Sequence, residues 1–224
     1  MSNTFAPFGF RPVSTSNGPI NWRVSTRRIA STNNSPIFKG DVVMPVTGTA
    51  NGYITVGLPG TIDGTHPIAG IFWGCQYLST TQKRTVWSQY WPGSDATGDV
   101  IAYVIDDPNA RFVVQAYGSS FVITGTNTAF GSSPVGQYAQ FGNNLITNGV
   151  DTGSPPNGST TTQQSGMYLT APGSTAASNP FIVTDMVIDP PGANGTDATS
   201  ANNYVVVGFN NEWLRGNVAV TGIS

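Results

Sequence analysis

Short apolar runs separated by glycine, proline and aspartate are the dominant pattern of this sequence. Within residues 66–117 such runs occur at 68–73, 85–91, 100–105 and 112–116, and all are rich in β-branched and aromatic residues. This texture is typical of consecutive strands joined by tight connections. We therefore predict that the stretch forms a strand meander at the centre of the fold.

Alternation of residue types supports this prediction at residues 111–117. Phe112, Val114 and Ala116 occupy every second position there, so they are expected to face one side of a sheet. Residues 79–84 are polar and lie between two apolar runs, and they are predicted to form a hairpin loop.

Further strands are predicted where the same texture recurs, at residues 20–29, 37–46, 53–56, 121–123, 167–169, 181–188 and 204–209. Glycine and proline interrupt every candidate helix, so almost no helix is expected. Short strands about ten residues apart with glycine at the corners are typical of a small β-barrel or a sandwich meander. The sequence thus predicts an all-β fold, with residues 21–224 as a single β-rich domain that has long polar loops at about 124–166 and 189–203.

The first twenty residues are predicted to form an extended N-terminal arm. Three residues that oppose regular structure occur in it: Pro7, Gly9 and Pro12. An exposed arm with three phenylalanines would favour aggregation, so the arm is expected to dock, either on its own subunit or on a neighbour. Phe5, Phe8, Phe10 and Arg11 are the candidate contact residues.

Charge is scarce in this protein. Only 9% of the 224 residues are charged and the formal net charge is −2, which argues against a nucleic-acid partner, because affinity for phosphates needs clustered Lys and Arg. The basic residues at 23, 27 and 28 are interpreted as a polar strand face. A surface so poor in charge either packs against neighbouring subunits at little desolvation cost or is simply a polar, solvated surface. No apolar run approaches the roughly 18 residues of a membrane span, and no secretory signal is recognised, so folding in the cytoplasm and no membrane partner are expected.

Residues suited to catalysis or cofactor binding are few. His66 is the only histidine, which leaves little room for a zinc site or a catalytic triad. The glycine spacings of nucleotide-binding loops are absent from the sequence. Cys75 is the single cysteine, so an internal disulfide is excluded, and it is interpreted as a small buried residue. No catalytic, cofactor-binding or metal-binding residue is therefore predicted, and the protein is not expected to be an enzyme.

Two acidic positions still merit an interpretation. Asp106 and Asp107 follow a predicted strand and could bind calcium or act in glycoside hydrolysis. Adjacent residues of a strand point to opposite faces, however, and Asp-Asp-Pro-Asn is ordinary turn chemistry, so a turn is favoured. Glu212, the sole glutamate, is expected to pair with Arg215.

Aromatic residues offer a different class of function. Trp73, Trp87, Tyr90 and Trp91 could form the platform of a carbohydrate-binding module if they were exposed. Their dense placement within the predicted meander favours core packing instead.

The opening residues 6–13, APFGFRPV, resemble the N-terminus of a group of tailed-bacteriophage virion proteins. The resemblance continues at residues 40–43, 68–77, 90–93, 101–109, 187–190 and 206–213. Proteins of this group are taken to be head decoration, or cement, proteins that bind the outside of the capsid shell. The resemblance implies a non-enzymatic virion structural protein on the capsid exterior, with the major capsid protein as its partner. A tail or neck protein and a carbohydrate-binding module for host attachment stay open as alternatives.

Symmetry adds an expectation about the oligomeric state. Local threefold axes are the most numerous multi-subunit sites of an icosahedral shell, and a closed cyclic oligomer leaves no open interface. The polar stretches 125–165 and 189–203 carry few charges and suit contacts between subunits. A homotrimer on the capsid is therefore predicted.

Overall fold

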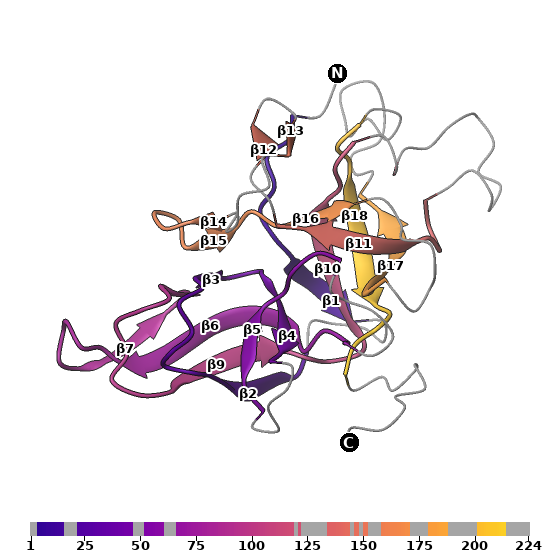
Figure 1. The fold of residues 1–224 in the computed structure, drawn as a ribbon. Coiled ribbons are helices and arrows are strands. Elements are labelled where there is room, and N and C mark those ends of the chain that lie inside the picture. The colour runs from indigo at the N-terminus through magenta and orange to yellow at the C-terminus, as the bar shows by residue number, and fades with distance from the viewer. Residues whose placement is uncertain are drawn as a thin grey trace.

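The computed structural model describes residues 4–15, 22–46, 52–60, 66–118, 121, 134–143, 146–147, 150–151, 158–170, 179–187 and 201–213. These residues form strands, turns and irregular segments, and none of them lies in a helix. The predicted all-β class is confirmed. Two six-stranded antiparallel sheets form the body of the molecule (Figure 1).

The first sheet has the strand order β1-β10-β18-β17-β11-β16. Its strands are β1 (Arg11–Thr15), β10 (Ala110–Gln115), β11 (Tyr138–Gly142), β16 (Tyr168–Thr170), β17 (Phe181–Met186) and β18 (Tyr204–Phe209). Phe112, Val114 and Ala116 are all fully buried, as their alternation predicted.

The second sheet has the order β2-β9-β6-β4-β5, and β7 pairs with β6. Its strands are β2 (Val24–Ile29), β4 (Val42–Pro45), β5 (Ile54–Val56), β6 (Gly70–Leu78), β7 (Thr85–Ser88) and β9 (Val100–Ile105). Strands β6 and β7 form the predicted hairpin around residues 79–84.

Three short pairs of strands complete the described structure. They are β3 (Ile37–Phe38) with β8 (Tyr90–Trp91), β12 (Ile146–Thr147) with β13 (Val150–Asp151), and β14 (Gly158–Ser159) with β15 (Gln164–Ser165).

Both sheets are strongly curled. A single parallel bridge between Arg28 and Tyr53 joins β2 to the residue before β5, and another between Ala116 and Leu169 joins the end of β10 to β16. Neither bridge is part of a ladder, so no barrel is closed among the described strands. The architecture is that of a sandwich.

One apolar core lies between the two sheets and includes residues from both. The Phe10 ring stacks on Phe181 at 4.5 Å between centroids, and Phe181 in turn stacks on Phe209 at 6.0 Å. From the other sheet, the Val42 amide donates to the Met167 sulfur at 3.2 Å. Burial of this core is the main source of cohesion between the sheets.

The prediction of one continuous meander over residues 66–117 is wrong at its last strand. β9 pairs with β2 and β6, whereas β10 pairs with β1 and β18 in the other sheet. The chain crosses between sheets at residues 106–109. The local sequence pattern could not show this crossing, because β9 and β10 are both rich in β-branched residues.

The long loop predicted at about 124–166 is partly wrong. Tyr138–Gly142 forms β11, which pairs with both β16 and β17, and Gly158–Ser165 forms the β14–β15 hairpin. Ile146–Thr147 and Val150–Asp151 form the β12–β13 pair. Residues 124–133, 144–145, 148–149 and 152–157 of that stretch, and 189–200, lie outside the described residues. Of the strand predicted at 121–123, only Phe121 is described, and it is buried.

The prediction that the first twenty residues lack regular structure is wrong for Arg11–Thr15. These residues form β1, which pairs antiparallel with β10 and has a register shift between Pro12 and Ser14. Pro12 is compatible with this role because β1 ends the strand order of its sheet, where a missing amide donor is tolerated.

Asp41 is buried where the N-terminal segment, the β3–β4 turn and β15 meet. Its carboxylate accepts a hydrogen bond from the Phe38 amide at 2.7 Å and another from the Ser165 side chain. The Phe10 amide donates to the Gly40 carbonyl at 3.0 Å next to it. Burial raises the pKa of Asp41 to about 7, against the opposing effect of these two hydrogen bonds.

This raised pKa predicts a pH dependence of stability. The unfolded pKa is near 3.8, so between about pH 4 and pH 7 the native state binds more protons than the unfolded state. Stability supplied by Asp41 is therefore complete below pH 4 and is lost as the pH rises through 7. Urea unfolding at intervals from pH 4 to 8 should show the wild type losing stability relative to Asp41→Asn over that window. A stability difference between the wild type and Asp41→Asn that stays constant with pH would contradict the raised pKa of Asp41.

Candidate binding surface

The three arm phenylalanines lie in different environments on their own chain. Phe10 is fully buried in the core, so it is a structural residue. Phe5 is half-buried and makes edge contacts with Tyr117 at 5.0 Å and Tyr168 at 5.2 Å.

Gln115 holds the start of this segment in place. Its side chain accepts from the Ala6 amide at 2.8 Å and donates to the Thr4 carbonyl at 2.8 Å and the Asn202 carbonyl at 3.1 Å. A fully buried glutamine with these partners fixes residues 4–6 against the end of β10. Of the two docking alternatives, packing on the same subunit is the one that these contacts display.

Phe8 and Arg11 form the accessible part of the segment. Phe8 is half-buried beside Tyr204, with ring centroids 5.7 Å apart, and Arg11 is exposed. The Arg11 guanidinium lies 4.3 Å from the centre of the Phe8 ring and donates to the Gln164 side chain at 2.7 Å. Contact of these residues with a neighbouring subunit remains a prediction.

A second accessible surface lies around Trp87, a residue for which the sequence favoured core packing. The solvent-facing side of β2, β9, β6 and β7 carries a row of residues that pair with one another across the four strands. We call this row and the residues beside it the Trp87 face. It comprises Arg28, Ile101, Gln76 and Trp87 in register, with Tyr103 and Leu78 beside them.

Trp87 dominates this face. It is 67% exposed and stacks on Tyr103 with ring centroids 5.7 Å apart and planes 10° from parallel. The Tyr103 hydroxyl donates to Gln76 at 3.2 Å. The face is thus a flat aromatic and aliphatic surface on which Arg28 is the only charged residue.

The prediction that the aromatic residues of the meander pack in the core holds for Trp91 and is wrong for Trp87. Trp91 is fully buried and donates its indole N–H to the Asn33 carbonyl at 3.2 Å. Trp73 is half-buried under the Lys39 ammonium, and Tyr90 is half-buried against Phe38.

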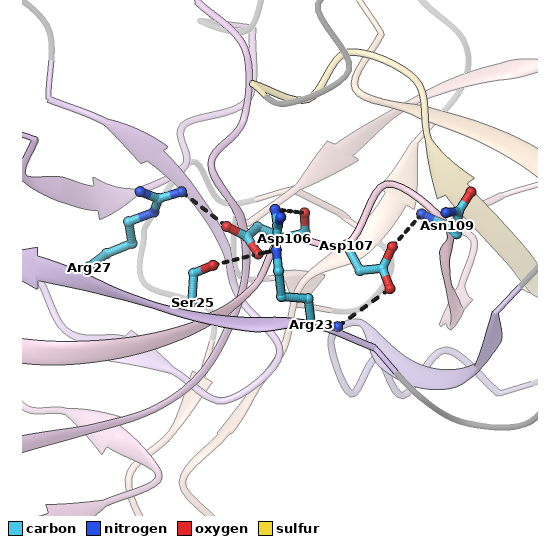
Figure 2. Close-up of polar contacts among 6 residues, drawn as sticks. All are labelled: Arg23, Ser25, Arg27, Asp106, Asp107 and Asn109. Atoms are coloured by element: carbon cyan, nitrogen blue, oxygen red, sulfur yellow. Dashed lines mark hydrogen bonds and ion pairs between the residues drawn. The ribbon is translucent and has the colours of Figure 1, made fainter.

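Asp106 and Asp107 lie just after the end of β9, and Arg23 contacts both of them (Figure 2): its side chain donates to Asp106, and its backbone amide donates to Asp107 at 3.4 Å. The buried Asp106 carboxylate accepts from the Arg23 Nε at 3.0 Å, the Arg27 guanidinium at 3.0 Å and the Ser25 hydroxyl at 2.9 Å. Asp107 accepts from the Asn109 amide at 2.9 Å, which is the predicted turn geometry.

Of the basic residues interpreted as a polar strand face, Arg27 and Arg28 lie on β2 and Arg23 precedes it. Arg23 and Arg27 pair with the buried Asp106, and Arg28 is exposed. Glu212 is buried, and its expected partner Arg215 lies outside the described residues.

Groups with reactive potential are separated in this structure. His66 is half-buried, and within the described part of the chain no three His, Cys, Asp or Glu residues come together as metal ligands do. Cys75 is buried as predicted, and burial raises the pKa of its thiol to about 12, so it is protonated at neutral pH. The described residues also include no helix that could cross a membrane.

Comparisons with models of protein families, with curated proteins and with solved structures give no match for this chain.

The two tryptophans of the β7–β8 region provide a test of the assigned surface. Trp91→Ala should lower the free energy of unfolding by about 3–5 kcal/mol, because it empties a core site. Trp87→Ala should change it by less than about 1 kcal/mol, because most of that ring is already in water. Urea unfolding followed by circular dichroism measures both, and equal losses would contradict the exposure of Trp87.

The Asp106 network makes a similar paired prediction. Asp106→Ala leaves two guanidinium groups facing a buried, unmatched site and should cost about 3 kcal/mol of stability. Asp107→Ala removes hydrogen bonds at a half-buried turn and should cost about 1 kcal/mol. Chemical unfolding of the two variants under identical conditions checks the ranking, and the reverse order would refute it.

Proposed function

We propose that this protein is a non-enzymatic structural component of a tailed-bacteriophage virion, a head decoration protein that binds the outer surface of the major capsid shell. In this role it stabilises the shell against the pressure of the packaged DNA. It folds in the host cytoplasm, docks on the capsid exterior, and needs no cofactor, nucleic acid or membrane.

The exposed Trp87 face is the observation that carries this proposal. Trp87, Leu78 and Ile101 present apolar surface to water on one face of the sheet. Exposed apolar patches rimmed by polar residues are typical of protein interaction sites. Because Arg28 is the only charged residue on the Trp87 face, burying this face against another protein desolvates little charge.

The resembling segments provide separate support. Residues 6–13, 40–43 and 68–77 lie apart in the sequence but meet in space. The Phe10 amide donates to the Gly40 carbonyl at 3.0 Å, and the Gly40 amide donates to the Phe72 carbonyl at 2.9 Å. Three of the seven segments that resemble the virion proteins therefore meet at one junction between the two sheets.

A homotrimer at the local threefold axes of the shell is part of the proposal. Such a trimer contacts adjacent capsid subunits symmetrically and repeats one interface without leaving an open edge. Binding of this kind depends on burial and backbone pairing, so it should respond weakly to salt.

Fractionation of virions tests the location. Quantitative mass spectrometry of heads and tails, purified separately from a phage lysate, should find the chain in heads, at copy numbers comparable with the capsid protein. Its confinement to tails or necks would overturn the capsid assignment. In rebinding to heads stripped of this protein, Trp87→Ala should lower occupancy about tenfold, whereas Tyr138→Ala, on the other sheet, should not.

A carbohydrate-binding module for host attachment is the second candidate, and the Trp87–Tyr103 stack favours it. An exposed tryptophan ring next to the Gln76 amide offers the apolar platform and the polar group that sugars require. Binding of host-surface polysaccharide, detected by tryptophan fluorescence and lost in Trp87→Ala, would support this candidate. Failure of stripped heads to bind the protein would complete the case for it.

A further inference from the structure

Two cationic side chains come together where the two sheets meet. Arg11 belongs to β1, and Lys39 follows β3. The β15 residue Gln164 links them, because its side chain accepts from the Arg11 guanidinium at 2.7 Å and its backbone bridges to Lys39. The Ser165 amide also donates to the Lys39 carbonyl at 2.9 Å.

Each cation lies over an aromatic ring. The Lys39 ammonium is 3.9 Å from the centre of the Trp73 ring, and the Arg11 guanidinium is 4.3 Å from that of Phe8. A further ring extends the arrangement on each side, since Trp22 packs edge-on against Trp73 at 6.2 Å and Tyr204 lies beside Phe8. We call this row of residues the cationic strip; it comprises Tyr204, Phe8, Arg11, Gln164, Lys39, Trp73 and Trp22.

The two positive charges repel each other when no anion lies between them. Burial against its neighbours lowers the pKa of Lys39, and the positive charge of Arg11 lowers it further. Both salt bridges found among the described residues go to Asp106, so neither strip cation has a carboxylate partner there. Asp41 is close in sequence, but its carboxyl accepts from the Phe38 amide and the Ser165 side chain.

We propose that the cationic strip binds a carboxylate-bearing peptide segment of a partner protein, in which an Asp or Glu is flanked by apolar residues. The carboxylate accepts hydrogen bonds from Arg11 and Lys39, and the flanking side chains cover Phe8 on one side and Trp73 on the other. Guanidinium donors are suited to planar carboxylates, and aromatic rings supply apolar contact area at low entropic cost.

A nucleic acid is disfavoured as the occupant because the strip has only two cations and the whole chain is net negative, at −2. A peptide with a carboxylate between apolar side chains also matches the order of groups along the strip, in which the two cations lie between aromatic rings. The strip's chemistry does not depend on the proposed virion function; only the identification of the partner as the capsid protein rests on it.

Two peptide arrays test the proposal on the intact protein. Both consist of capped pentapeptides with apolar residues at the flanking positions; one has Glu at the centre and the other has Gln. The wild type should bind a subset of the Glu peptides and none of the matched Gln peptides. The double variant Arg11→Gln/Lys39→Gln should bind these Glu peptides at least about tenfold more weakly, since each cation contributes a charged hydrogen bond.

The matched control is Lys83→Gln/Arg84→Gln in the exposed β6–β7 hairpin, which removes the same net charge elsewhere. It should bind like the wild type. Circular dichroism and urea unfolding establish that both variants fold, and Arg11→Lys, which keeps the charge, should bind more tightly than Arg11→Gln.

Three results would overturn the proposal: no Glu peptide binding, equal loss in the control variant, or displacement of the peptides by inorganic phosphate at low millimolar concentration. The last would identify a general anion site. A chain found only in tails would overturn the capsid assignment and leave the peptide result intact, so the two failures are distinguishable.

Discussion

The pairing of the edge strand β2 with β9 depends on the buried carboxylate of Asp106. It lies where the chain leaves β9 for β10, and a charge at such a place must be matched. Ser25 and Arg27, two residues apart on β2, reach it from the same strand face, and Arg23 adds a donor to the carboxylate and another to the Asp106 carbonyl. A one-residue slip of β2 would turn these donors away, so the network fixes the register of an edge strand at the crossing point.

The N-terminal segment is a second connection between the sheets. Beyond the strand pairing of β1 with β10, the Gly9 amide donates to the Met167 carbonyl at 3.1 Å and the Phe10 amide to Gly40. Gly9 has a φ of 75°, and a Cβ there would overlap the Ser165 side chain, so the close approach requires glycine. Phe10 then enters the core at the position that this backbone path dictates.

The fold presents two accessible surfaces of opposite character. The Trp87 face is apolar and nearly uncharged, whereas the cationic strip brings together two of the chain's nine basic residues. A partner that contacts both would gain burial from one and directional hydrogen bonds from the other. Such a division suits a protein that must bind one position on an assembly tightly, because apolar area gives affinity and the polar pair gives register.

The sequence by itself determined the elements that depend on local alternation and turn chemistry. The inward positions of β10, the hairpin at residues 79–84, the turn at Asp107 and the burial of Cys75 all follow from neighbours in the chain. Tyr138–Gly142 was missed although Ala139 and Phe141 alternate inward, because glycine-rich and polar flanks hide so short a strand.

Only the tertiary structure decided which sheet each strand joins and which aromatic residues meet water. Trp87 and Trp91 are four residues apart in the same texture, yet one lies on the outer face of β7 and the other in the core. Arg11 and Lys39 are brought together by a β15 residue more than a hundred positions away. Strand pairing and sheet curvature join residues that are distant in sequence, and local pattern carries no information about those partners.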